Sequence, residues 1–122
     1  MTITIMIVDD SPTIRKSAEI FLKGTEYRVV SAEDGYSALA VLRKEKPDVV
    51  FADIMMPRMD GYQLCATVKK NREFKDTPLV LLSSKNSPFD MARGRIAGAE
   101  EYITKPFNKQ QLLEAIQRYI KE

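Results

Sequence analysis

The stretch ITIMIVDDSP, residues 3–12, leads from an apolar segment directly into two acids and a helix start. The segment from Thr2 to Val8 is rich in β-branched residues and predicts a strand. Ser11 and Pro12 are residue types typical of an N-cap and a first helical position, and Gly24 is a suitable stop for that helix. A strand followed at once by a helix is the repeating unit of an α/β protein.

The same unit is predicted four more times along the chain. Strands are expected at residues 27–32, 48–52, 78–82 and 101–104, and helices at residues 35–46, 62–71, 90–97 and 108–122. The run 48–52 is apolar on both faces, so we expect it to lie in the middle of a sheet. Short links and right-handed crossovers predict an α/β fold in which a five-stranded parallel sheet has helices on both faces.

The composition describes one globular domain, residues 1–122, with 44% hydrophobic and 30% charged residues. A net charge of +2 is too small to indicate a nucleic-acid partner, and no apolar run approaches the ~20 residues of a membrane span. The N-terminus lacks the features of a signal peptide, and Cys65 has no partner for an internal disulfide, so we expect a cytoplasmic protein. Because the last helix is expected to reach Glu122, we expect no attached output domain.

Polar residues with complementary chemistry follow four of the predicted strands. Asp9 and Asp10 follow the first strand, Asp53 the third, Ser83 the fourth and Lys105 the fifth. The carboxyl ends of parallel strands share one edge of the sheet, so we expect these side chains to converge there. Oxygen ligands without histidine or cysteine favour Mg²⁺ or Mn²⁺, and a lysine and a hydroxyl suit the oxygens of a phosphoryl group.

The chemistry expected at this edge is phosphoryl transfer. Three close carboxylates should resist full ionisation until a cation arrives, and Asp53 would then be a nucleophile that forms an acyl phosphate. The chain contains no histidine, which excludes Ser-His-Asp and Cys-His catalysis, histidine metal ligands and a phosphohistidine of its own.

Each of these residues also has an ordinary structural interpretation. Asp9 and Asp10 could be an acidic cluster at a helix start, and Asp53 could cap the helix that follows it. Ser83 could bond within its own turn, and Lys105 could be an exposed loop lysine.

The remaining charged features have simple interpretations. The Lys69-Lys70 and Arg93/Arg95 pairs are interpreted as solvated faces. Gly94 lies inside a short predicted helix and is expected to make that helix marginal, by ~1 kcal/mol relative to alanine.

Taken together, the chain resembles a response-regulator receiver domain of the chemotaxis type over essentially its whole length. The motifs that carry the resemblance are IVDDS at 7–11, DIMMPRMDG at 53–61, LLSS at 81–84 and YITKPF at 102–107. The resemblance implies a flavodoxin-like (βα)5 receiver fold. It also implies that the chain is a phosphoacceptor signalling domain rather than an enzyme. Such a domain catalyses only its own phosphorylation and dephosphorylation.

The resemblance assigns the acids to two tasks. Asp53 would be the phosphoacceptor. Mg²⁺, with Mn²⁺ as a substitute, would be bound by Asp10, Asp53 and the backbone carbonyl of Met55, and Asp9 would help directly or through water.

The resemblance also assigns the switch. Ser83 would be the switch hydroxyl, Tyr102 the aromatic switch residue and Lys105 the partner of the phosphoryl group, followed by a cis bond to Pro106. Ser84 stands where the family often has alanine or glycine, a mild departure that changes no assigned role.

The implied function is that of a stand-alone response regulator of a two-component system. A histidine kinase or histidine phosphotransfer domain would phosphorylate it, and it would switch a surface that binds a downstream target protein. We expect no nucleic-acid partner, no membrane insertion, and a monomer or weak dimer. The stretches DIMMPRMDGYQLCATVKKN and SSKNSPFDMARGRIAGAEEYITKPF also resemble regulators of twitching motility by type IV pili. Three alternatives stay open: a phosphorelay intermediate, a phosphatase with an aspartyl intermediate, and a phosphorylation-independent adaptor.

Overall fold

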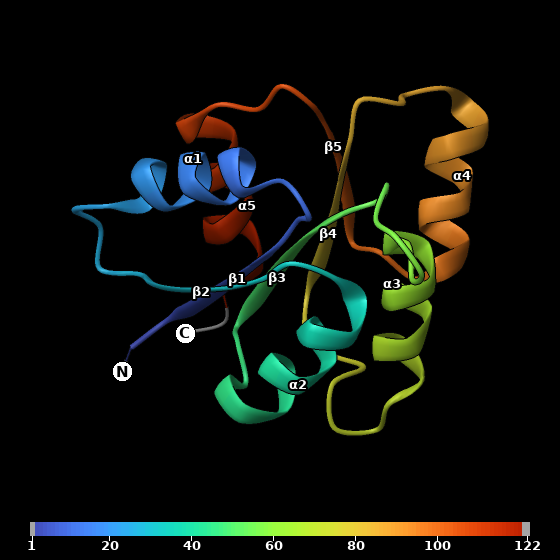
Figure 1. Ribbon diagram of the computed structural model, residues 1–122, viewed down its shortest axis with the longest axis horizontal. Helices are drawn as coiled ribbons and strands as arrows, with labels where there is room; N and C mark the ends of the chain where they lie inside the picture. Colours follow the sequence, from blue (N-terminus) through green and yellow to red (C-terminus); the bar gives the residue numbers. More distant parts are fainter. Residues whose placement is uncertain (1, 121–122) are drawn as a thin grey trace.

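Strands and helices alternate along the whole of the computed structural model, which describes residues 2–120 (Figure 1). The strands are β1 (Thr4–Val8), β2 (Arg28–Ala32), β3 (Val49–Asp53), β4 (Leu79–Ser83) and β5 (Glu101–Thr104). The helices are α1 (Pro12–Leu22), α2 (Gly35–Glu45), α3 (Gly61–Lys70), α4 (Pro88–Ala97) and α5 (Lys109–Tyr119).

The five strands form one parallel sheet in the order β2-β1-β3-β4-β5. Strand β3 is central and fully buried, as its apolar character predicted. The chain passes from β1 outward to β2 and then crosses back to β3, so the direction of winding reverses between β1 and β3. Ligands of doubly wound sheets bind at this switch point. The predicted five-stranded parallel fold is confirmed.

The sheet separates two hydrophobic cores. In Figure 1, α1 and α5 cover one face of the sheet, and α2, α3 and α4 cover the other. Ile5 and Ile7 of β1 pack in the core with α1 and α5, whereas Met6 and Val8 pack in the opposite core. This alternation follows from the two-residue period of a strand, and it fixes the register of the sheet.

Several element ends differ from the predictions by one residue, and three differ by two or more. Strand β1 begins at Thr4 rather than at Thr2. Helix α4 begins at Pro88, because the Ser87 side chain caps it by accepting a hydrogen bond from the amide of Asp90. Helix α5 ends at Tyr119, and Ile120 is its extended C-cap, so the predicted helix is too long. The last two residues of that prediction, 121 and 122, lie outside the described residues.

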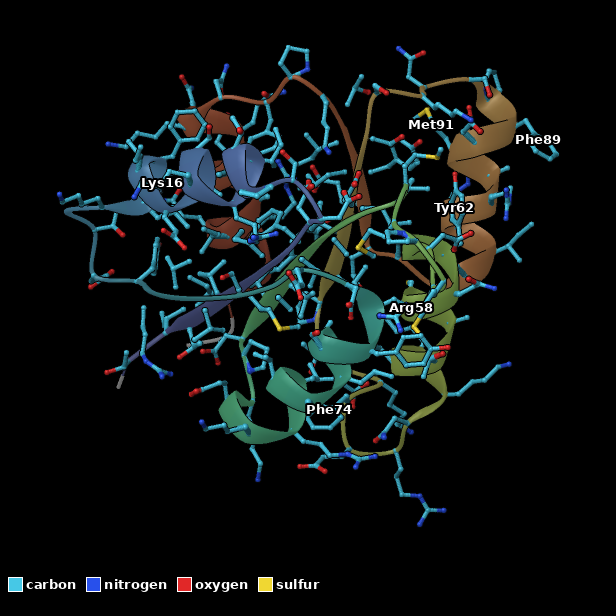
Figure 2. All side chains as sticks on the ribbon, in the orientation of Figure 1. Lys16, Arg58, Tyr62, Phe74, Phe89 and Met91 are labelled. Atoms are coloured by element: carbon cyan, nitrogen blue, oxygen red, sulfur yellow. The ribbon has the colours of Figure 1, made fainter. Side chains whose placement is uncertain are left out.

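Of the basic side chains predicted to be solvated, Lys70, Arg93 and Arg95 are exposed, whereas Lys69 is half-buried and has specific partners. Lys69 Nζ donates to the carbonyl of Thr77 at 2.7 Å and to Glu100 Oε2 at 2.8 Å. The guanidinium of Arg93 in α4 lies 4.2 Å from the ring centre of Tyr62 in α3. Figure 2 shows Tyr62 against α4, where its hydroxyl donates to the carbonyl of Asp90. Within residues 2–120, no helix has the length and apolar character needed to cross a membrane.

Candidate functional site

Three carboxylates converge at the edge of the sheet where β1 and β3 end. Oxygen atoms of Asp9, Asp10 and Asp53 lie within 4.8 Å of one another. Asp9 follows the last residue of β1, Asp53 is the last residue of β3, and these two strands are neighbours. Asp9 is 0% exposed and Asp53 5% exposed, whereas Asp10 faces solvent. The structure therefore brings the three predicted acids together.

Lys105 lies between the two buried acids. Its Nζ donates to Asp53 Oδ1 at 2.9 Å and to Asp9 Oδ2 at 3.0 Å, and its side chain is 19% exposed. The peptide bond from Lys105 to Pro106 is cis, as the resemblance implied. The interpretation of Lys105 as an exposed loop residue is wrong, because the end of β5 directs its side chain into the acid cluster.

The burial of this cluster changes its proton affinities. Burial raises the pKa of Asp53, and the hydrogen bond from Lys105 offsets only part of that effect. Burial alone would lower the pKa of Lys105, but the hydrogen bonds to Asp53 and Asp9 outweigh it and raise the pKa. The result is a charged lysine beside a carboxylate that is poorly solvated and readily neutralised by a cation or a proton.

Asp9 is not the N-cap of α1, and hydrogen bonds hold its carboxylate in the acid cluster. The N-cap of α1 is Ser11, whose hydroxyl accepts from the amide of Ile14 at 3.4 Å. Asp9 Oδ1 accepts from the amide of Ser11 at 2.9 Å, and the Asp9 carbonyl accepts from Arg15 at 2.5 Å. These contacts fix the orientation of the Asp9 carboxylate and leave its second oxygen to Lys105.

Asp53 does not cap the following helix either. The N-cap of α3 is Asp60, which forms a capping box with Gln63. Residues 54–60 form a loop that closes on itself, because a Cβ at Gly61 would lie 2.4 Å from the carbonyl oxygen of Asp53. Met55, two residues after Asp53 in this loop, is 58% exposed. Only glycine at position 61 permits this close approach of the two loop ends.

Ser83 and Tyr102 are connected through the backbone of Lys85. The Ser83 hydroxyl accepts from the Lys85 amide at 3.0 Å, and the Tyr102 hydroxyl donates to the Lys85 carbonyl. A hydrogen bond within the turn, the ordinary structural interpretation of Ser83, is therefore present. Ser83 is also buried at the end of β4. Lys85 thus bonds to Ser83 through its amide and to Tyr102 through its carbonyl.

Gly94 allows α4 to lie against the Tyr102 ring. A Cβ at position 94 would be 3.2 Å from Tyr102 Cδ2 and 3.2 Å from Leu81 Cδ1. The prediction treated this glycine only as a weakness of the helix. The packing role of Gly94 could not be predicted, because Leu81 and Tyr102 belong to strands β4 and β5, away in the sequence from the helix that contains Gly94.

The three acids fit a hard divalent cation. They offer carboxylate oxygens, and the exposed Asp10 leaves the cluster open to water on one side. Mg²⁺ prefers oxygen ligands and retains several waters, which such an edge site permits.

One contact of the loop after β3 has no signal in the sequence. Arg58 Nη2 lies 3.2 Å from Asp34 Oδ2, which joins the loop after β3 to the start of α2. Arg58 also has a φ of 68°, in the left-handed region. No local sequence signal marks an arginine for that conformation, whereas a glycine or asparagine there would have done so.

Comparison with known proteins agrees with this geometry. The family model described as response regulator receiver domain matches residues 5–117. Protein PilG of Pseudomonas aeruginosa is 51% identical over 116 residues, which cover 95% of this chain and 86% of PilG. Protein PilH of the same species is 38% identical over 112 residues, which cover 92% of this chain and 93% of PilH. The probable transcriptional regulator ycf27 of Guillardia theta is 41% identical over 88% of this chain, but the match spans only 41% of ycf27.

Solved structures give the same result. Chemotaxis protein CheY4 of Vibrio cholerae superimposes with a TM-score of 0.92 at 34% identity, covering 98% of this chain and all of CheY4. The resemblance seen in the motifs is therefore confirmed in sequence and in fold, and the chain belongs to the response regulator receiver domain family.

Proposed function

We propose that this chain is a stand-alone response regulator of a two-component system, consisting of a single receiver domain over residues 1–122. The observation that carries this proposal is the cluster of Asp9, Asp10 and Asp53 with Lys105 bonded to both buried acids. The lengths of two relatives support the single-domain assignment, because the matches span 86% of PilG and 93% of PilH. The domain catalyses only its own phosphorylation and dephosphorylation.

Asp53 is the proposed phosphoacceptor. One of its carboxylate oxygens attacks the phosphorus of a phosphohistidine on a histidine kinase or a histidine phosphotransfer domain. A P–O bond forms, the P–N bond breaks, and its electron pair returns to the imidazole nitrogen. The raised pKa of Asp53 supports this role, because a poorly solvated carboxylate is more basic and more nucleophilic than an exposed one.

Asp9, Asp10, Asp53 and the backbone carbonyl of Met55 would hold Mg²⁺, or Mn²⁺ in its place. When bound, the ion supplies positive charge that neutralises the acids and the phosphoryl oxygens during transfer. Lys105 supplies the second positive charge. Its ammonium already lies 2.9 Å from Asp53, so it can exchange a carboxylate oxygen for a phosphoryl oxygen with little movement.

Ser83 and Tyr102 form the proposed switch. The Ser83 hydroxyl turns toward a phosphoryl oxygen and releases the amide of Lys85. Because the carbonyl of Lys85 holds Tyr102, this release changes the constraint on the tyrosine ring. The surface made by α4, β5 and α5 then changes between two states, and a downstream target protein binds one of them.

The proposed pathway is control of twitching motility by type IV pili. The 51% identity to PilG supports it, together with the motif resemblance. The chain is proposed to act in the cytoplasm, as a monomer or weak dimer, without a nucleic-acid partner.

The test uses acetyl phosphate as a small phosphoryl donor. With Mg²⁺ present, intact mass should show one added phosphoryl group, and Asp53→Asn should remove it. Undiminished labelling of Asp53→Asn would overturn the assignment. Incubating the labelled protein with a histidine phosphotransfer domain distinguishes the two uses of the label. Rapid transfer to that domain would indicate a phosphorelay intermediate, whereas retention on this chain supports a regulator that acts on a target.

A further inference from the structure

The tip of the loop after Asp53 is attached to the first turn of α2. Arg58 pairs with Asp34 at 3.2 Å, and its guanidinium lies 5.3 Å from the ring centre of Tyr36. Next to it, Met59 packs so closely on Gly35 that a Cβ at position 35 would lie 2.6 Å from the Met59 sulfur. Figure 2 shows Arg58 between the start of α2 and helix α3.

The other bonds of this loop do not determine where its tip lies. The amide of Met59 donates to the carbonyl of Pro57 at 2.8 Å, and the amide of Gly61 donates to the carbonyl of Ile54 at 2.9 Å. Both bonds lie within the loop or at its base. The buried side chains of Ile54 and Met56 hold the base of the loop in the core, whereas the tip contacts α2 through Arg58 and Met59.

Arg58 adopts an uncommon backbone conformation to make its contact. Its φ of 68° lies in the left-handed region, which residues other than glycine, asparagine and aspartate adopt rarely. Such a conformation persists only where surrounding contacts favour it. The pairing with Asp34 and the stacking on Tyr36 are the contacts that the Arg58 side chain makes here.

Asp34 divides its two carboxylate oxygens between separate tasks. Oδ1 accepts from the amide of Ser37 at 2.7 Å and so caps α2, whereas Oδ2 accepts from Arg58. The side chain of Asp34 is only 13% exposed, so the cap holds it in a fixed position for Arg58. One residue thus connects the start of a helix to the loop that follows the phosphoacceptor.

We propose that Asp34 and Arg58 are positioning residues for the loop that carries Met55, whose backbone carbonyl is a proposed ligand of the cation at the acid cluster. This inference rests on the proposed function, because it assigns a purpose to the loop at the same cation site. Mg²⁺ demands near-ideal octahedral geometry, whereas Ca²⁺ accepts flexible coordination. A loosened loop should therefore weaken Mg²⁺ binding more than Ca²⁺ binding.

Two substitutions remove the pair between Asp34 and Arg58 while keeping the backbone conformation of the loop and the N-cap of α2. Arg58→Gly removes the guanidinium and suits the left-handed backbone. Asp34→Ser keeps an N-cap hydroxyl for α2 and removes the acceptor of Arg58. The matched control is Glu45→Gln, which removes the pair that Glu45 forms with Arg28 at 2.7 Å near the other end of the same helix.

The measurement is calorimetric titration of each apo variant with Mg²⁺ and with Ca²⁺, together with its urea unfolding curve. We expect the Mg²⁺ Kd to rise about 3- to 10-fold in Arg58→Gly and in Asp34→Ser, with a smaller change for Ca²⁺. The double variant should match the single ones, because both remove the same pair. Arg58→Lys should recover part of the affinity, and Glu45→Gln should bind Mg²⁺ as the wild type does.

The inference is overturned if both Arg58→Gly and Asp34→Ser bind Mg²⁺ as the wild type does, or if only one of them loses affinity. An equal loss in Glu45→Gln would overturn it too, since a general effect of α2 would then be responsible. These outcomes are distinguishable from failure of the proposed function. That failure would appear as acetyl phosphate labelling of Asp53→Asn, whatever the Mg²⁺ affinities of the loop variants.

Discussion

The ammonium of Lys105 donates a hydrogen bond to Asp53 at 2.9 Å, so the proposed phosphoacceptor is already paired before any phosphoryl group arrives. The same ammonium holds Asp9 at 3.0 Å. A single cation therefore offsets the repulsion between two buried acids, and the proposed phosphorylation would rearrange an existing contact rather than create the first one.

Removing the lysine charge should destabilise the metal-free protein. In Lys105→Met the two buried acids lose their partner, and we expect the unfolding free energy at pH 7 to fall by about 2 kcal/mol. The loss is smaller than that of a fully buried pair because the ammonium is partly exposed. Saturating Mg²⁺ should reduce the loss, since it neutralises the same acids. Urea unfolding with and without Mg²⁺ measures both values, with exposed Lys109→Met as control. An equal loss under both conditions would contradict the proposed cation site.

The stability of the apo protein should depend on the ionisation of Asp53. Its pKa is raised above 3.8 by burial, which the Lys105 hydrogen bond only partly offsets. The folded state therefore holds this proton more tightly than the unfolded state, and stability falls as the pH rises from 3.8 through the raised folded value. Asp53→Asn carries no such charge. We expect the variant to match the wild type below this window and to exceed it at pH 7. Thermal unfolding over a pH series checks this, and a less stable variant at pH 7 would show that the Lys105 pairing outweighs burial.

Gly94→Ala should not stabilise the protein, although alanine favours a helix by ~1 kcal/mol over glycine. The added Cβ would press on Tyr102 and Leu81 at 3.2 Å, so α4 must shift away from β5. Urea unfolding should show no gain in the wild-type background. In a Tyr102→Ala background, where the ring is absent, part of the alanine benefit should return. If Gly94→Ala alone raised the unfolding free energy by the full ~1 kcal/mol, Tyr102 and Leu81 would have to move aside at no cost.

The phosphoryl group should be lost slowly, over many seconds or longer. Met55, two residues after Asp53, is exposed and apolar, and the side chain of Lys85, two residues after Ser83, has no acceptor to take a proton from water. We expect Met55→Asn with Lys85→Glu to shorten the lifetime, because together they supply an amide that orients water and an acceptor for its proton. Effects of positioning of this kind reach ~10²-fold. Decay of labelled protein in excess chelator measures the lifetime, and equal lifetimes would show that these positions do not control access of water.

The sequence predicted the parts of this molecule that depend on local patterns. The strand periods, the Ser11-Pro12 helix start and the buried character of β3 each follow from a few neighbouring residues, and all three are present. The convergence of Asp9, Asp10, Asp53 and Lys105 also followed from one rule, that parallel strands end at the same edge of a sheet.

The parts that could not be predicted depend on pairs of residues that only the tertiary fold brings together. Arg58 and Asp34 are 24 residues apart, and Lys69 and Glu100 are 31 apart. Nothing near Lys69 in the sequence indicates that its ammonium will pair with the carboxylate of Glu100. The α4 start is a different case, since Ser87 and Pro88 are a local signal that the prediction overlooked.

Asp9 and Lys105 are 96 residues apart in the sequence and 3.0 Å apart in the fold. During synthesis, the acids therefore leave the ribosome long before the lysine that neutralises them. Until β5 docks beside β4, a nascent chain has two unpaired carboxylates at the end of a nearly finished sheet. The pairing of Lys105 with the proposed phosphoacceptor Asp53 thus forms only when almost the entire domain has been made, so an incomplete or truncated chain should be a poor phosphoryl acceptor.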